Sequence, residues 1–493
     1  MHTPLVVLGG GPGGYAAAFF AADEGLEVII VEQEGRLGGT CLLRGCIPSK
    51  ALLHVARVLS EVEELKKDWG VDFGDPQLDI EKLRGRKDKV IASLSGGLKQ
   101  LAKRRNVKVI TARAAFENST TLKLEGDDAS IPEDRTLTFD QCIVATGSLP
   151  AMPASFEIGS DRVMDSTGAL SLADVPETLL VIGGGYIGLE MGTVYARLGS
   201  KVSVVEALDG ILLAADRDLV KPLQKHLTAL FEDRIFLNTK VGSLGLREDK
   251  VEVAFEGPSK FGVERYDRVL VAVGRKPNTR GLGLDTTKAV VTPRGFIEVD
   301  KSMRTADPNI LAIGDVAGDP MLAHKASHEA RVAVEAVLGK PTTFDKLCIP
   351  AVVFTDPELA WCGLTQQEAE KTGRAVEVAI YPWAASGKAI ALGRTEGLTK
   401  LIVDPETERV LGCGIVGPGA GDLISEAALA IEMGCEVRDL AETVHPHPTL
   451  SETMMNASET FFGTATEIYK PKRHREAEAK PAGEGSDKET ATP

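Results

Sequence analysis

A short apolar run that leads into glycines and then into a helix-like stretch, alanine-rich in the first copy, occurs twice along the chain. The first copy spans residues 6–15 and the second spans residues 180–190. In both copies the apolar run predicts a buried strand, and the stretch after the glycines predicts a helix. The two copies share one glycine spacing: Gly9, Gly11 and Gly14 in the first, and Gly183, Gly185 and Gly188 in the second. A strand–turn–helix unit repeated in register predicts an α/β fold with two Rossmann-like dinucleotide-binding domains.

Further patterns divide the rest of the chain. Residues 139–150 resemble residues 266–277, and each segment predicts a strand that ends at a glycine turn and leaves its domain. The last block alternates strand-like and helical runs, with strands expected at 351–354, 398–403 and 410–416 and a helix at 423–433. It therefore predicts an α+β domain, and the polar tail after it is too poor in apolar residues to order itself. The expected segments are 1–150, 151–275, 276–347, 348–469 and the disordered tail 470–493.

Composition narrows the class of protein. The chain has 493 residues, 43% hydrophobic and 26% charged, which is typical of a globular protein. Its net charge of −15 argues against binding to nucleic acid or to an anionic membrane, and no apolar run reaches the length of a membrane span. Seven cysteines are too few for a disulfide scaffold, so a close pair indicates redox or metal chemistry in a reducing compartment. With no basic segment before the first strand, we expect no cleaved leader and a cytoplasmic location.

A glutamate ends the next predicted strand of each repeat. Glu32 follows the first glycine turn and Glu206 follows the second at the same spacing. A carboxylate at this place accepts hydrogen bonds from the two ribose hydroxyls and repels a 2′-phosphate. No arginine follows Glu206 until Arg217, so the second domain is expected to prefer NAD over NADP. The alternative is that each glutamate is an ordinary surface residue.

Two cysteines follow the first acidic strand end, in the segment G-G-T-C-L-L-R-G-C-I-P-S-K. Cys41 and Cys46 allow three interpretations: metal ligands, inert core thiols or a redox disulfide. A zinc site would need a second ligand pair nearby, and His54 alone does not supply it. On an ideal helix the two residues would be about 7.5 Å apart along the axis, too far for an unstrained disulfide. Gly45 and Pro48 let the helix start distort, and a strained, accessible bridge is the reducible kind.

A histidine cluster stands near the end, in T-V-H-P-H-P-T-L-S-E. His447 with Glu452 fits an acid–base pair, because histidine accepts protons near neutral pH and a carboxylate can fix its tautomer. The alternative is structural, since Thr449 and Glu452 match a helix capping box. His445 and His447 could also pair as metal ligands, but the prolines beside them make a poor site. From the spacing alone, catalysis and capping stay open.

Together these motifs resemble the flavin-dependent pyridine nucleotide–disulfide oxidoreductase family, and within it the dihydrolipoamide dehydrogenases of bacteria. The resemblance covers the chain to about residue 469 and rests on a highly specific set of segments: 38–50, 312–318, 321–329, 382–389 and 445–452. It implies an enzyme that oxidises protein-bound dihydrolipoyl groups through a disulfide and FAD to NAD+. It further implies a homodimer that serves a 2-oxo acid dehydrogenase complex or a glycine cleavage system, with a lipoyl-bearing acyltransferase or carrier protein as partner.

The resemblance also implies roles for single residues, with 1–150 binding FAD, 151–275 binding NAD, 276–347 returning to FAD and 348–469 forming the dimerisation domain. The FAD residues are Gly9, Gly11, Gly14, Glu32, Lys50, Gly147, Asp315 and Ala323. The NAD residues are Gly183, Gly185, Gly188, Glu206, Ala272, Gly274 and Arg275, and Glu190 pairs with Lys50 beside the flavin. Cys41 is the interchange thiol that meets lipoamide, and Cys46 lies nearest the flavin. His447, steadied by Glu452, faces the cysteines of the other subunit, and no metal is expected.

Two departures from the family pattern and one rival activity remain. Leu43-Arg44 replaces the usual Asn-Val, and Arg44 could lower the pKa values of the thiols or alter access to them. Tyr186 stands where glutathione-type reductases carry tyrosine, which raises the alternative of an NAD(P)H-dependent reductase of another low-molecular-weight disulfide. Glu206 counts against the NADPH that such reductases use. A silent scaffold would have lost a thiol, the base or a nucleotide acid, and none is lost.

Overall fold

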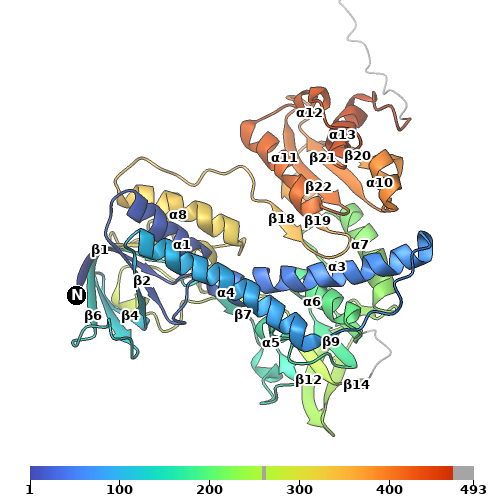
Figure 1. Ribbon diagram of the computed structural model, residues 1–493. Helices are drawn as coiled ribbons and strands as arrows, with labels where there is room; N and C mark the ends of the chain where they lie inside the picture. Colours follow the sequence, from blue (N-terminus) through green and yellow to red (C-terminus); the bar gives the residue numbers. More distant parts are fainter. Residues whose placement is uncertain (258–261, 470–493) are drawn as a thin grey trace, which may run out of the picture.

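The first predicted βαβ unit forms the centre of a seven-stranded sheet in the computed structural model, which describes residues 1–257 and 262–469 (Figure 1). Strand β1 (His2–Leu8) leads through the glycine turn into α1 (Pro12–Asp23), and β2 (Val28–Glu32) pairs parallel with β1. The strand order is β3-β2-β1-β6-β5-β4, with β17 beside β6. The remaining strands are β3 (Lys108–Thr111), β4 (Arg113–Asn118), β5 (Thr121–Glu125), β6 (Thr136–Val144) and β17 (Ile310–Ala312). The predicted tail, 470–493, lies outside the described residues.

The second predicted βαβ unit builds a sheet of its own. Strand β9 (Thr178–Ile182), helix α6 (Tyr186–Arg197) and strand β10 (Lys201–Val205) repeat the first unit, and the strand order is β11-β10-β9-β15-β8. A separate antiparallel sheet, β12-β13-β14, was not predicted from the sequence. The bounds are β8 (Val163–Met164), α5 (Ser166–Ser171), α7 (Arg217–Leu230), β11 (Ile235–Phe236), β12 (Lys240–Arg247), β13 (Lys250–Glu256), β14 (Val263–Tyr266) and β15 (Arg268–Val271).

The chain leaves the first domain and returns to it through a two-stranded connection. Strand β7 (Ser148–Pro150) pairs antiparallel with β16 (Arg275–Pro277), so the ends of the two segments recognised as similar in sequence lie side by side. After β16 the chain returns to the first sheet, where β17 pairs parallel with β6. Helix α8 (Ala323–Val337) then packs against α1. The segment 276–347 therefore belongs with the first domain.

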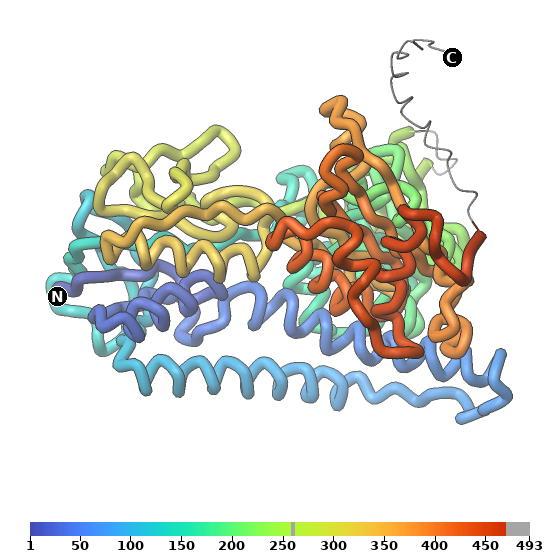
Figure 2. Tube along the Cα trace, turned by 90° about the horizontal axis from the view of Figure 1, so that it is seen from above, coloured from blue at the N-terminus to red at the C-terminus, as the bar shows by residue number. Residues whose placement is uncertain are grey.

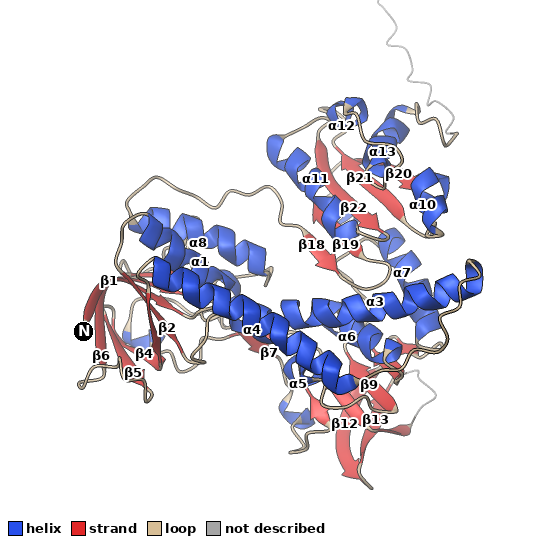
Figure 3. Ribbon diagram, viewed as in Figure 1, coloured by secondary structure: helices blue, strands red, loops and turns tan. Residues whose placement is uncertain are grey.

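The last block is a five-stranded antiparallel sheet covered by helices, and the helices and strands expected there are confirmed (Figure 3). The strand order is β18-β19-β22-β21-β20, and helices α11 and α13 pack on the sheet. Its strands are β18 (Ala351–Val353), β19 (Leu359–Gly363), β20 (Glu377–Pro382), β21 (Leu398–Val403) and β22 (Val410–Val416). Its helices are α9 (Gln366–Thr372), α10 (Gly387–Leu392), α11 (Ala420–Met433), α12 (Val437–Glu442) and α13 (Glu452–Phe462).

Two long helices link these parts. Helices α3 (Cys46–Asp68) and α4 (Ile80–Arg104) run along one side of the molecule, as Figure 2 shows. Helix α3 begins beside the first domain and packs against α6 of the second, so its first turn lies where the two dinucleotide domains meet. Among the described helices, none is both long and apolar enough to cross a membrane.

A buried lysine joins the second domain to the last block. Lys400 on β21 is 1% exposed, and its Nζ lies 3.0 Å from Oδ2 of Asp216 and 2.8 Å from Oδ2 of Asp218. It also donates to the side-chain oxygen of Gln366, at 2.7 Å. Asp216 and Asp218 lie at the start of α7, so this cluster connects two domains.

We expect the variant Lys400→Met to be strongly destabilised, because it leaves the buried carboxylate of Asp216 without a cation. Breaking a buried ion pair from one side costs about 3–5 kcal/mol. Thermal denaturation followed by circular dichroism should show a clear fall in Tm. The exposed Lys371→Met is the control, since it also removes one lysine and should leave Tm close to that of the wild type.

Candidate active site

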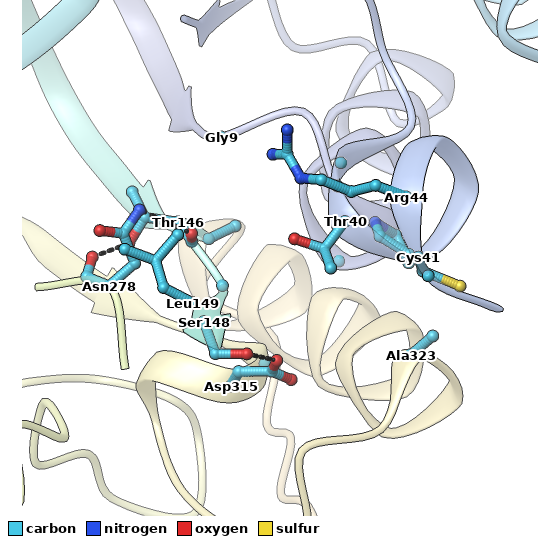
Figure 4. A pocket seen from close by; sticks show the side chains of 18 of the residues that line it. Gly9, Thr40, Cys41, Arg44, Thr146, Ser148, Leu149, Asn278, Asp315 and Ala323 are labelled. Atoms are coloured by element: carbon cyan, nitrogen blue, oxygen red, sulfur yellow. Dashed lines mark hydrogen bonds between the residues drawn. The ribbon is translucent and has the colours of Figure 1, made fainter. Parts of the chain in front are cut away.

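All predicted FAD residues except Gly14 line one cavity of about 430 Å³ (Figure 4). Its walls come from the first glycine turn, the end of β2, helix α2 (Gly39–Arg44), the start of α3, the β7–β16 connection and the start of α8. Eleven of the predicted site residues line it: Gly9, Gly11, Glu32, Cys41, Cys46, Lys50, Gly147, Glu190, Arg275, Asp315 and Ala323. The topology therefore brings the cysteine pair and the dinucleotide turn into one space.

The first glycine turn is shaped to receive a phosphate. A Cβ at Gly14 would overlap the carbonyl oxygen of Gly9, so only glycine lets α1 approach the strand this closely. Helix α1 begins after Gly11 with no side chain capping its first N–H groups. Uncapped N–H groups and the helix dipole favour an anion at this end. The turn thus fits the pyrophosphate of a dinucleotide.

Glu32 is fixed beside this turn. Its Oε2 accepts a hydrogen bond from the backbone N–H of Gly10 at 2.6 Å, and its Oε1 accepts one from Glu34 at 2.9 Å. Burial raises the pKa of Glu32, and the two backbone N–H groups oppose that rise. Because the carboxylate also lines the cavity, it is placed to meet a ribose, as the sequence predicts.

The second glycine turn repeats this geometry. A Cβ at Gly188 would overlap the carbonyl oxygen of Gly183, and Oε2 of Glu206 accepts from the N–H of Gly184 at 2.7 Å. Beside the turn, the carbonyl oxygen of Ala272 packs against Gly183. Gly185 and Gly274 both have open space around the position of a Cβ. The second turn therefore repeats the packing and the fixed glutamate of the first, although its glycines and Glu206 do not line the cavity described above.

Arg275 lines the cavity of the first domain, although the sequence analysis assigns it to the second glycine turn. Its Nε donates to Oγ of Ser148 and its Nη2 donates to the carbonyl oxygen of Ser148, both at 2.7 Å. Ser148 in turn donates to the carboxylate of Asp315. Tyr186 lines the same cavity, and burial raises the pKa of its hydroxyl to about 12. The contact of Arg275 with a nicotinamide nucleotide stays a prediction.

The two cysteines are thiols that face each other across a break between two helices. Helix α2 ends at Arg44 and α3 begins at Cys46, with Gly45 between them at φ −141° and ψ −110°. This is the distortion that the sequence predicts, and a Cβ at Gly45 would lie 2.9 Å from the carbonyl oxygen of Thr40. Hydrogen bonding by Cys41, aided by the charge of Lys50, lowers the pKa of Cys46 to about 7, against the effect of burial. The same hydrogen bond and burial raise the pKa of Cys41.

Lys50 and Glu190 form the predicted ion pair behind Cys46. The Nζ of Lys50 lies 2.9 Å from Oε2 of Glu190, whose other oxygen accepts from the backbone N–H of Phe354 at 3.0 Å. The ring of Phe354 lies under the same ammonium group, with 4.3 Å from Nζ to the ring centroid. Phe354 belongs to the last block and was not predicted, so three parts of the chain meet at this cation.

His447 and Glu452 form the predicted pair, but away from the cavity. Nδ1 of His447 lies 2.9 Å from Oε1 of Glu452, and the imidazole is 80% exposed. The other oxygen of Glu452 accepts from the backbone N–H of Thr449 at 2.7 Å. This is one of the two hydrogen bonds of the alternative capping box, but the other is missing, because α13 begins at Glu452 and no side chain caps it. His445 points elsewhere and bonds Glu426.

Comparison with known proteins identifies the family. Residues 3–330 match the pyridine nucleotide-disulphide oxidoreductase family, and residues 349–458 match its dimerisation domain. The chain belongs to this family. Its members use FAD and NAD, and the glycine turns, the two glutamates and the cavity beside the cysteines fit these two dinucleotides. No group of three metal-ligating side chains is found among residues 1–257 and 262–469.

Relatives within the family are similar over nearly their whole length. The dihydrolipoyl dehydrogenase of Vibrio parahaemolyticus is 49% identical over 95% of this chain and 97% of its own. That of Geobacillus stearothermophilus is 42% identical over 95% and 98%. Among solved structures, LpdA from Mycobacterium tuberculosis has a TM-score of 0.84 at 27% identity, covering 93% of this chain and 99% of its own. The flavoprotein disulfide reductase RclA from Escherichia coli has a TM-score of 0.81 at 29% identity, covering 92% and 98%.

Proposed function

We propose that this protein oxidises protein-bound dihydrolipoyl groups to lipoyl groups and passes the electrons to NAD+. The observation that carries the proposal is the thiol pair Cys41 and Cys46, which lines the dinucleotide cavity beside the Lys50–Glu190 ion pair. The relatives named dihydrolipoyl dehydrogenase, at up to 49% identity over 95% of the chain, support lipoamide as the substrate. Reduction of a glutathione-like disulfide is not favoured by these relatives.

The reaction begins from the oxidised protein, in which Cys41 and Cys46 are joined. One dihydrolipoyl thiolate attacks Sγ of Cys41, which breaks the Cys41–Cys46 bond and releases the Cys46 thiolate. The second dihydrolipoyl thiolate then attacks the substrate sulfur of this mixed disulfide, which closes the lipoyl ring and releases Cys41. Cys46 suits the first departure because its pKa is lowered, and a thiol of low pKa leaves faster.

The two electrons must then leave the thiol pair. The first glycine turn and Glu32 would hold FAD, which when bound would supply the two-electron relay between the thiols and NAD+. Lys50 keeps a positive charge beside the Cys46 thiolate, and Glu190 together with Phe354 holds that ammonium in place. The chain therefore stabilises the charged sulfur of Cys46 and leaves Cys41 to exchange with substrate.

The protons of the dithiol need a base, and His447 is our candidate. It does not line the cavity of its own chain, and its imidazole is exposed on the block that matches the dimerisation domain. We infer a homodimer in which His447, oriented by Glu452, meets the thiols of the partner subunit. A lipoyl-bearing acyltransferase or carrier protein of a 2-oxo acid dehydrogenase complex or glycine cleavage system would be the partner, in a reducing, cytoplasmic compartment.

Two pairs of assays test the proposal. The purified protein should be yellow, should oxidise NADH with lipoamide and should reduce NAD+ with dihydrolipoamide. It should show little turnover with glutathione disulfide and NADPH. The opposite result, activity with glutathione disulfide and NADPH but none with lipoamide and NADH, would reject the proposal.

The variant Glu206→Gln should shift the nucleotide preference from NAD toward NADP. Glu206 is placed to accept ribose hydroxyls, and its charge repels a 2′-phosphate, whereas glutamine keeps the shape without the charge. Hydrogen bonds to a charged group contribute about 1.5–3 kcal/mol, so kcat/KM for NAD+ should fall about tenfold or more. Steady-state kinetics with both nucleotides measure the change, and Glu232→Gln, an exposed site in the same domain, is the control. An unchanged ratio of the two kcat/KM values would contradict this role.

A further inference from the structure

Arg44 extends from α2 into the nucleotide part of the cavity. It lies one helical turn after Thr40, and both side chains line the cavity. Figure 4 shows the guanidinium reaching past Thr40 toward the end of β1 at Gly9, on the far side of α2 from the sulfur of Cys41. The first residue of α2, Gly39, packs against Gly11 of the phosphate turn. The helix that carries Arg44 therefore borders the place where α1 receives a pyrophosphate.

The charge of Arg44 is directed at the nucleotide rather than at the thiols. Its Nη2 donates to the carboxylate of Glu34, two residues after the ribose-binding position Glu32. Arg44 is close enough to Glu32 to oppose the rise in the pKa of that carboxyl. Among the cations, Lys50 is the one with a large effect on the pKa values of Cys41 and Cys46. The expectation that Arg44 lowers the thiol pKa values or alters access to the thiols stays a prediction.

The guanidinium keeps donors free for an anion. Within the described part of the chain, its Nε and Nη1 have no hydrogen-bond partner, since Glu34 takes only Nη2. Two other cations at this cavity are engaged, Lys50 with Glu190 and Arg275 with Ser148, and Arg113 and Arg280 also line it. A planar guanidinium with two free donors matches the geometry of a phosphate.

We propose that Arg44 binds the pyrophosphate of FAD and that Glu34 holds the guanidinium in position for it. The inference rests on the proposed use of FAD and adds a residue that the family pattern does not provide, since asparagine and valine are usual at 43–44. The glycine turn offers only N–H groups and a helix dipole to the phosphates. Arg44 adds a full positive charge on the helix whose first residue packs against the phosphate turn.

Ligand titration of the apoprotein tests this role without relying on turnover. After removal of FAD, the dissociation constants of FAD, ADP and adenosine are measured by calorimetry for the wild type and for Arg44→Leu. ADP carries the pyrophosphate and adenosine does not. We expect Arg44→Leu to weaken the binding of FAD and of ADP at least tenfold and to leave the binding of adenosine unchanged. The affinity for ADP should also depend less on salt concentration in the variant than in the wild type. Arg36→Leu is the matched control, because Arg36 is an exposed arginine on the neighbouring loop that does not line this cavity.

The outcomes separate this inference from the proposed function. A wild-type apoprotein that does not bind FAD would overturn the proposed function, and this inference with it. Two results would overturn the role of Arg44 alone, provided that the wild-type apoprotein binds FAD. One is an Arg44→Leu variant that binds ADP as tightly as the wild type does. The other is a variant whose affinities for ADP and for adenosine fall by the same factor. If Arg44→Leu does not fold, Arg44→Lys provides the test, because lysine keeps the positive charge but lacks the planar guanidinium. This variant should bind ADP more weakly than the wild type and should bind adenosine equally well. Equal ADP affinity of Arg44→Lys and wild type would reject the bidentate contact.

Discussion

Replacing Cys41 with serine should abolish lipoamide reduction by NADH while sparing NADH-dependent reduction of an artificial acceptor such as ferricyanide. The lipoamide reaction needs a sulfur that forms a mixed disulfide, and serine cannot form one. The artificial acceptor takes electrons without thiol exchange, so the path from NADH through FAD stays intact. Removing a covalent nucleophile costs more than about a thousandfold in rate. The two activities should therefore separate by at least that factor in one preparation.

The control for this experiment is Cys435→Ser, which removes a cysteine from the last block. Cys435 is partly buried and does not line the cavity, so both activities should stay near the wild-type values. The flavin content of each variant is compared by its absorbance spectrum, which excludes loss of the cofactor as the cause. If Cys41→Ser lost both activities to the same extent, the thiol relay would be contradicted.

The dinucleotide units could be predicted from the sequence because their signals are local. Each unit requires a strand, a turn in which Gly14 or Gly188 touches the carbonyl of an earlier glycine, and a helix that starts at once. These requirements fix the spacing of the glycines in the sequence, and the duplication shows this spacing twice. The break at Gly45 was equally local, since glycine between two cysteines allows the chain to distort.

Contacts between distant segments could not be predicted in this way. Phe354 reaches the Lys50–Glu190 pair from another domain, and no spacing in the sequence links the three. Arg275 follows a turn that resembles the nucleotide motif, yet the pairing of β16 with β7 turns its side chain toward Ser148. Such contacts depend on how whole sheets are connected, and only the fold reveals them.

The pair His447 and Glu452 lies between these two cases. The sequence placed them close enough to interact and left catalysis and capping open. The structure shows that Glu452 uses one oxygen for His447 and the other for the backbone of Thr449, so orientation of the imidazole and local structure share one carboxylate. The proposed role of the imidazole requires a partner subunit, because the cavity of its own chain does not include His447.

Replacing His447 with glutamine should slow lipoamide reduction about 10²–10⁴-fold, the usual contribution of a general acid–base, and leave ferricyanide reduction unchanged. Glu452→Gln should cost less, since it weakens only the orientation of the imidazole. The matched control is His54→Gln, an exposed histidine on α3. Equal losses in both activities for His447→Gln would contradict an acid–base role.

A mixed dimer decides whether His447 acts across the subunit boundary. Homodimers of Cys41→Ser and of His447→Gln should each be inactive with lipoamide. In a dimer with one chain of each kind, purified through two different affinity tags, the intact cysteines of one chain face the intact histidine of the other. One of the two active sites should then work, with about half the wild-type rate per dimer. If His447 served its own chain, both sites would carry a defect and the mixed dimer would stay inactive. Because 80% of the imidazole is exposed in the single chain, we expect recovery.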